Sequence, residues 1–147
     1  MLEKIKSKLL EFYNKEDKIW LFFSIFDKNN KLLISNWVLT TDKPIVELIE
    51  ILYHAILEKQ TWAHTIAIDI IKEIKQEPDI QKILSLNTKD YWIFAMNKEN
   101  NTSWVILPNT AWINDSKTAL WVLKEKYKLS WNVEVYSFTS RRIAFEI

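Results

Sequence analysis

The chain contains no glycine and no cysteine in its 147 residues. Average glycine usage is about 7%, so roughly ten glycines are expected in a chain of this length. Eight tryptophans nearly fill that deficit. Some bacterial lineages read the UGA codon as glycine, and a translation that reads UGA as tryptophan would write such a sequence. We therefore predict that tryptophan here largely stands for glycine in the native protein.

The positions of the tryptophans support this prediction. Trp62 and Trp131 each follow an apolar helical pattern, at the point where a chain commonly turns left-handed and glycine is favoured. Trp104 opens a strand after a polar turn, and Trp37 closes a strand-like run before a polar loop. Trp121 fits least well, because it lies within a helical pattern. The alternative is eight genuine tryptophans, buried in a core or exposed for binding.

The other absences exclude several classes of protein. Without cysteine there is no disulfide, no thiolate metal site and no cysteine nucleophile, and a reducing compartment fits. The first residues read as an amphipathic helix, and no run approaches the ~20 apolar residues of a membrane span. Twenty basic and 19 acidic residues give a net charge of +1, against the basic face of a nucleic-acid binder. We expect a cytoplasmic protein that contacts neither membrane nor nucleic acid.

The apolar patterns predict one domain over residues 1–147, of α+β class, with a mainly antiparallel sheet and about three helices packed on it. Asp42 is expected to cap the second helix, with Pro44 in its first turn. The expected helices cover 2–14, 42–59 and 115–129, with a short element at 80–84, and the expected strands cover 19–26, 31–39, 64–74, 91–96, 104–107, 133–138 and 142–147.

Few side chains suggest chemistry. His54, Glu50 and Glu58 share one helical face, which could be a metal or acid–base site, but a solvated charged face explains the spacing and we expect no metal. His64 falls in step with inward-facing isoleucines, so it is either a pocket base or a hydrogen-bonded histidine at a sheet edge. The pair Arg141–Arg142 is interpreted as a solvated basic spot. No pattern indicates a cofactor.

Two polar segments could bind a ligand. Ser35 and Asn36 lie near the end of an expected strand, where polar groups often serve binding, although both residue types also favour ordinary turns. Asn109 follows Pro108 at another strand end and could line the same cleft as Ser35.

When each W is read as G, nearly the whole chain resembles the AMMECR family, which is protein A of the AmmeMemoRadiSam system. The order and spacing of short segments carry the resemblance. The family's G-x-F-V-T-L, L-R-G-C-I-G, K-P-L, D-G-L, G-V-L-L-P and E-L-Y-R-F segments are matched by Trp20–Ile25, Lys31–Trp37, Lys43–Ile45, Asp90–Ile93, Trp104–Pro108 and Val133–Phe138. The resemblance implies an AMMECR-like fold and, as partners, a Memo-like protein and a radical-SAM protein.

The departures concern the L-R-G-C-I-G signature. Leu33 stands for its arginine, Ile34 for its inner glycine, Ser35 for its cysteine and Asn36 for its isoleucine, while Trp37 agrees with its last glycine if it is recoded. Serine is a far weaker nucleophile without an adjacent base. The family's R-F-P-P segment has no equivalent here. The fold is therefore expected to carry over better than any activity.

Three hypotheses for function follow. The first is a non-catalytic or weakly catalytic AMMECR-like domain that acts through a partner protein or a small ligand, and the second is a module that stacks bases or sugars on genuine tryptophans. The third is an enzyme of the same fold with Ser35 or His64 in a cleft. The candidate ligand or signature residues are Leu33, Ser35, Asn36, Trp37, His64, Pro108 and Asn109.

Overall fold

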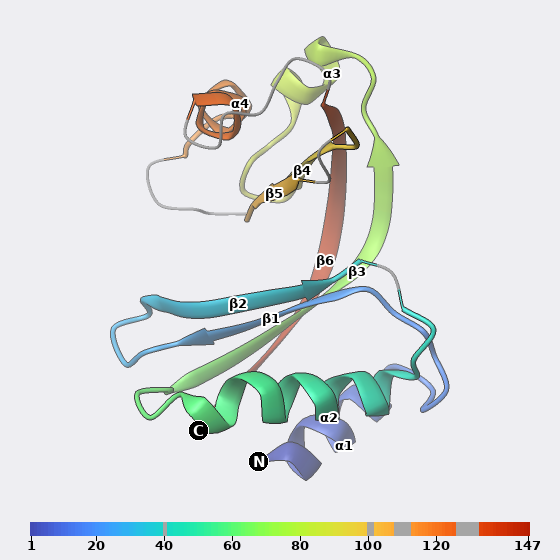
Figure 1. Cartoon of the computed structure of the whole chain (residues 1–147), viewed down its shortest axis with the longest axis vertical. Helices are drawn as coiled ribbons and strands as arrows, with labels where there is room; N and C mark the ends of the chain where they lie inside the picture. The colour runs from blue at the N-terminus through green and yellow to red at the C-terminus, as the bar shows by residue number, and fades with distance from the viewer. Residues whose placement is uncertain (40, 100–101, 108–112, 126–132) are drawn as a thin grey trace. The chain divides into compact units, whose positions relative to one another are not determined.

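The computed structural model describes residues 1–39, 41–99, 102–107, 113–125 and 133–147 (Figure 1). The chain is α+β, as predicted, and its six strands follow the order β2-β1-β3-β6-β4-β5. Every strand pair whose register is resolved is antiparallel. The elements are α1 (Leu2–Leu10), β1 (Leu21–Phe26), β2 (Leu32–Val38), α2 (Ile45–Ile56), the 3-10 helix η1 (Leu57–Lys59), β3 (Thr65–Gln76), α3 (Ile80–Ser85), β4 (Trp92–Asn97), β5 (Thr102–Ile106), α4 (Ser116–Glu125) and β6 (Glu134–Glu146).

The chain forms two compact units. Unit 1 comprises Met1–Ile71 together with Ser140–Ile147, and unit 2 comprises Lys72–Thr139. Strands β3 and β6 each contribute residues to both units. The single domain expected over residues 1–147 stays a prediction.

In unit 1, α1 and α2 cover one face of the layer formed by β1, β2 and β3 (Figure 1). The predicted second helix buries a stripe of apolar residues, which consists of Ile45, Leu48, Ile49, Leu52 and Ile56. Its burial follows from the helical period, which places these side chains on one side. The core of this unit consists of Ile5, Leu9, Leu21, Phe23, Ile25, Ile45, Leu48, Ile49, Leu52, Ile56, Leu57, Ile66, Ile68, Ile70, Ile143 and Phe145.

The start of α2 differs from the prediction. Pro44 is the N-cap residue, with extended backbone (φ −57°, ψ 150°), and no side chain caps the helix. Asp42 is therefore not the cap. The N–H of Ile45 instead donates to the backbone oxygen of Asp17 at 2.8 Å. A backbone carbonyl brought in from the loop before β1 thus satisfies a donor that a cap residue usually serves.

In unit 2, β4 pairs with β5 on one side and with β6 on the other. The α4 helix is capped by Asp115, whose Oδ1 accepts from the N–H of Thr118 at 2.7 Å. Trp92 and Phe138 are both buried, and their rings stack with centroids 5.3 Å apart. The apolar cluster of this unit consists of Ile83, Ile93, Ala95, Ile106, Ile113, Ala119, Val122 and Val135.

Two predictions about strands are wrong. The segments expected as separate strands at 133–138 and 142–147 form the single strand β6. The segment 64–74 was expected to bury its isoleucines on one face only; Ile66, Ile68 and Ile70 are buried in β3, but Ala67 and Asp69 between them are buried too. Both faces of this part of β3 are covered, so alternation disappears. The part of the predicted third helix beyond residue 125 lies outside the described residues.

Among the described residues, no helix combines the length and the apolar character that crossing a membrane requires.

Candidate functional site

The signature segment lies on β2, and its neighbours are set by the register of three strands. Phe22 of β1 faces Trp37 of β2 on one side and Asp69 of β3 on the other. Ser24 of β1 faces Ser35 of β2 and Ala67 of β3 in the same way. Because side chains two residues apart share a face of a strand, these two cross-strand rows lie on one face of the sheet. The core residues Leu21, Phe23 and Ile25 alternate with them and lie on the helix-covered face.

Ser35 is held in place by another serine. Its Oγ lies 2.8 Å from the Oγ of Ser24, and either hydroxyl could be the donor. Ser24 is fully buried, whereas Ser35 is partly exposed. A hydroxyl does not remove a proton as a histidine or carboxylate would, so this contact orients Ser35 without activating it as a nucleophile.

Trp37 packs beside Phe22 on the same face. The two ring centroids are 6.2 Å apart, with the planes inclined at 34°. Phe22 is fully buried, while Trp37 remains 37% exposed. Such a tilted aromatic pair fixes the indole against the sheet and leaves part of it available to a ligand or partner.

An ion pair in this region was not predicted from the sequence. Arg142 of β6 donates from Nε to Asp69 Oδ1 at 2.9 Å and from Nη2 to Asp69 Oδ2 at 2.8 Å. Ser140 Oγ also donates to Oδ1, at 3.3 Å. The carboxylate is buried and the guanidinium is about half exposed. Arg142 is exposed, as expected, but it is also a charge partner, because a buried carboxylate must be paired and this arginine supplies the pairing.

One signal in the sequence could have revealed this pair. Asp69 interrupts a run of apolar residues in β3, and an acidic residue inside a buried strand requires a partner. Arg142 precedes Ile143 in a segment that alternates between buried and exposed residues. Its neighbour Arg141 behaves differently, since its guanidinium carbon lies 4.9 Å from the centroid of the half-exposed Phe12 ring.

His64 does not join Ser35. Its backbone N–H donates to the backbone oxygen of Phe26 at 2.9 Å, and its backbone carbonyl accepts from the N–H of Ile147 at 2.8 Å. Its ring Nδ1 lies 3.3 Å from Thr65 Oγ1. The row that contains Ser35 crosses β3 at Ala67, three residues further along. At about 3.3 Å per residue, this separates the two by about 10 Å along the strand. His64 is exposed, directly before the start of β3, and does not face inward.

The other predicted site residues are dispersed. Leu33 is the extra residue at a bulge, where Ile25 faces Ile34 but Phe26 faces Leu32, and it packs against the core of unit 1. Asn36 faces Phe23, so it lies on the opposite side of β2 from Ser35, and it is exposed. Pro108 and Asn109 lie outside the described residues.

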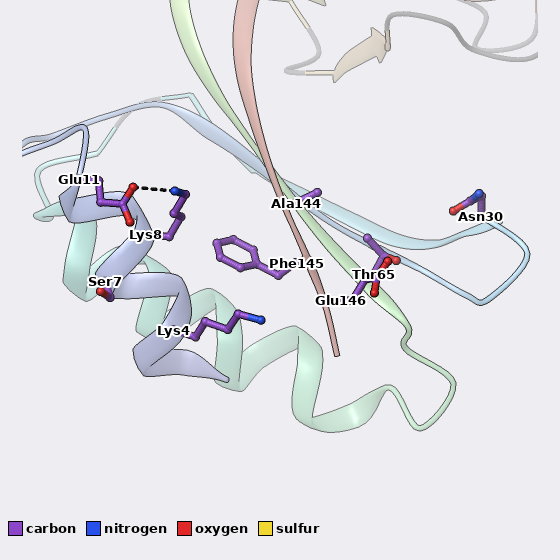
Figure 2. Close-up of a pocket in the computed structure, with 9 residues that line it drawn as sticks. All are labelled: Lys4, Ser7, Lys8, Glu11, Asn30, Thr65, Ala144, Phe145 and Glu146. Carbon is purple, nitrogen blue, oxygen red and sulfur yellow. Dashed lines mark hydrogen bonds and ion pairs between the residues drawn. The ribbon is translucent and has the colours of Figure 1, made fainter.

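A groove of about 770 Å³ lies in unit 1 between α1 and the ends of β3 and β6 (Figure 2). Phe145 lies at its centre and is almost fully buried. Lys8 forms an ion pair with Glu11 at 2.6 Å, and Lys4 projects toward the strand side (Figure 2). The groove is lined by Lys4, Ser7, Lys8, Glu11, Asn30, Thr65, Ala144, Phe145 and Glu146. Its two lysines and two glutamates balance in charge.

Within the described residues, no three histidine, aspartate or glutamate side chains gather closely enough to hold a metal ion. Glu50, one of the carboxylates beside His54, accepts a hydrogen bond from Lys6 Nζ at 2.9 Å. This hydrogen bond holds the pKa of Glu50 below its ordinary value of 4.5. Glu50 therefore joins α2 to α1, as part of a surface ion pair.

The tryptophans occupy ordinary backbone positions where the structure describes them. Asn30, with φ of 59°, is the one described residue with positive φ, so Trp62 does not turn left-handed and that prediction is wrong for it. The chain leaves η1 through Gln60 in an extended conformation, which removes the need for a left-handed residue. Trp131 lies outside the described residues. Of the indoles that the structure describes, Trp62 and Trp121 are the most exposed, at 81% and 60%, whereas Trp92 is buried.

Comparison with known proteins identifies the fold. No family model matches the chain, and no curated protein matches it. The crystal structure of the uncharacterized protein PH0010 from Pyrococcus horikoshii is similar, with a TM-score of 0.68 and 16% sequence identity. The match covers 88% of this chain and 75% of that one. At this level of identity the likeness concerns the fold alone.

Proposed function

We propose that this chain is an AMMECR-like binding domain, non-catalytic or weakly catalytic, that acts through a partner protein or a small ligand in an AmmeMemoRadiSam-type system. The observation that carries the proposal is the contact between Ser35 and Ser24, at the position where the resembling family has cysteine. A serine whose described partner is another hydroxyl is suited to donating or accepting a hydrogen bond, and poorly suited to nucleophilic attack.

The surroundings of Ser35 support binding as its role. Trp37, two residues along the same strand, presents a partly exposed indole on the same face of β2. A hydroxyl beside an aromatic surface is a common arrangement for recognising a polar group and the apolar surface next to it. The Memo-like and radical-SAM proteins of the same host are the partners that the resemblance implies.

The test is direct binding. The chain is immobilised and titrated with each of the two proteins by biolayer interferometry, using the wild type and a Ser35→Ala variant. We expect micromolar binding to at least one of them and a loss of about tenfold in Ser35→Ala, which corresponds to one hydrogen bond of about 1.4 kcal/mol. Ser85→Ala, a change on α3 in unit 2, is the matched control and should bind as the wild type does. Equal binding by Ser35→Ala would remove Ser35 from the site, and no binding to either protein would contradict the assignment of partners.

The second candidate function is the stacking of bases or sugars on tryptophans, favoured by the exposure of Trp62 and Trp121. In unit 1 the exposed indoles do not gather. Trp37 lies in the cross-strand row that contains Asp69 of β3. Trp62 precedes the first residue of β3, and that first residue is four residues, or about 13 Å along the strand, from Asp69. Fluorescence titration with single-stranded oligonucleotides and with oligosaccharides tests this function, and unchanged indole emission would exclude it.

The identity of the eight tryptophans is a separate proposal. Their number and the complete absence of glycine support UGA recoding. Peptide mass spectrometry on the protein from its native host, covering Trp62, Trp104 and Trp131, tests it. Glycine at these positions would strengthen the AMMECR resemblance and remove the stacking function, whereas tryptophan would weaken the first and leave the second to be tested.

A further inference from the structure

Strand β2 is an edge strand with unusually little protection. It is first in the order of the sheet, and among the described residues it pairs with β1 only. Its seven residues, LLISNWV, include no charged residue and no proline. Edge strands carry unpaired N–H and C=O groups, and natural proteins usually protect them with lysine, proline or very short length. The bulge at Leu33 affects only the first part of β2, so Ile34–Val38 keeps a regular edge.

We propose that this edge pairs with β2 of a second copy of this chain, antiparallel and centred on Asn36. The strand is self-complementary in this register. Across a two-fold axis at Asn36, Ile34 faces Val38 of the other copy, and both residues pack against the core of unit 1. The pairing would therefore continue the apolar, helix-side face of one copy into that of the other. Since β2 has no charge, no like-charge pair opposes it.

The same register has a consequence for the candidate site. Ser35 faces Trp37 of the second copy across the axis, and both lie on the face that carries the hydroxyl pair of Ser24 and Ser35. The two copies would thus build one composite surface containing two hydroxyl pairs and two aromatic residues. The inference stands independently of the proposed ligand or partner, because it depends only on the backbone edge and on the lack of charge.

Substitutions at Asn36 test the register, because this exposed side chain would lie opposite Asn36 of the second copy. Analytical ultracentrifugation over a wide concentration range is expected to show a species of about twice the chain mass of 17.7 kDa. Asn36→Lys and Asn36→Glu should each be monomeric, because like charges directly opposite one another destabilise an antiparallel pair. An equimolar mixture of the two variants should restore the dimer, since the facing charges are then opposite.

Restoration by mixing also shows that both variants are folded. Asn114→Lys, which adds the same charge at an exposed position of unit 2, is the control and should remain dimeric. A wild type that is monomeric at all concentrations would overturn the proposal. Dimers that persist in both Asn36 variants would place the interface elsewhere, and a mixture that remains monomeric would overturn the pairing centred on Asn36. The outcome is expected to be the same with tryptophan or glycine at residue 37.

Discussion

The two units differ in how deeply their described tryptophans are buried. In unit 1 the core cluster is mainly isoleucine and leucine, joined by Phe23 and Phe145, and the described tryptophans of this unit lie half-buried or exposed. In unit 2, Trp92 is the largest fully buried side chain of the described residues, and it stacks on Phe138. Reading tryptophan as glycine would therefore leave the core cluster of unit 1 intact and would remove the large, buried side chain of Trp92 from unit 2. Replacement of tryptophan by glycine is therefore expected to affect unit 2 much more than unit 1.

The largest expected effect comes from Trp92→Gly. Loss of a buried tryptophan side chain costs about 3–5 kcal/mol, and glycine within a strand adds about 0.5–1 kcal/mol. Urea unfolding monitored together with amide hydrogen exchange should locate this loss in unit 2. Trp62→Gly, at the most exposed indole of unit 1, is the control and should change the free energy of unfolding by less than about 1 kcal/mol. Equal losses in both variants would contradict the difference between the units.

The next effect concerns the ion pair of unit 1. Arg142→Ala leaves the buried carboxylate of Asp69 without its two charge-assisted hydrogen bonds. Removing one partner of a fully buried pair costs about 3–5 kcal/mol, and because Arg142 is half exposed we expect about 2 kcal/mol. Arg141→Ala, one residue earlier, loses only a ring contact with Phe12 and should cost less than about 1 kcal/mol. Thermal unfolding of both variants makes the comparison, and similar losses would argue against the role of Arg142.

A smaller loss of stability is expected in unit 2, where the carboxylate of Glu77 is bound by a serine hydroxyl and not by an arginine. Ser137 is buried, and its Oγ donates to Glu77 Oε1 at 2.7 Å. Ser137→Ala should lower the free energy of unfolding by about 1–1.5 kcal/mol. Ser140→Ala, which loses a longer contact of 3.3 Å to a carboxylate already held by Arg142, should cost less than half as much. Urea titration distinguishes the two, and the reverse order would show that the distances do not rank these bonds.

The smallest effect is electrostatic. The hydrogen bond from Lys6 holds the pKa of Glu50 below 4.5, so the contribution of this pair to stability is present above pH 4.5 and is lost as the pH falls through the lower, folded-state pKa. Lys6→Met should raise the pKa of Glu50 toward its ordinary value, as measured by NMR titration of the side-chain carboxyl. Lys15→Met, whose contact is to Glu16 at 3.9 Å, should leave Glu50 unchanged. An unchanged pKa in Lys6→Met would show that the ion pair does not persist in solution.

Helices and strands were predicted from the sequence better than the tertiary contacts of their residues. The helix at Ile45–Ile56 and the strands that pair as β1 with β2 and β4 with β5 were predicted from helical and strand periods, because these periods are local. The burial of both faces around Asp69, and its pairing with Arg142 73 positions away, depend on tertiary contacts that no local pattern contains. The candidate site shows the same limit, since Ser35 was identified from the resemblance, whereas its partner Ser24 emerges only from the register of β1 with β2.

The membership of Ser140–Ile147 in unit 1 has a consequence for synthesis. Ile143 and Phe145 belong to the core of unit 1, but they follow all of unit 2 in the chain. A ribosome adds about 5–20 residues per second, so the stretch Lys72–Thr139 takes about 3–14 s to emerge. During that interval the apolar residues of β1 and β3 lack the strand that completes their core. The nascent chain thus passes through a period in which the core of unit 1 still lacks Ile143 and Phe145.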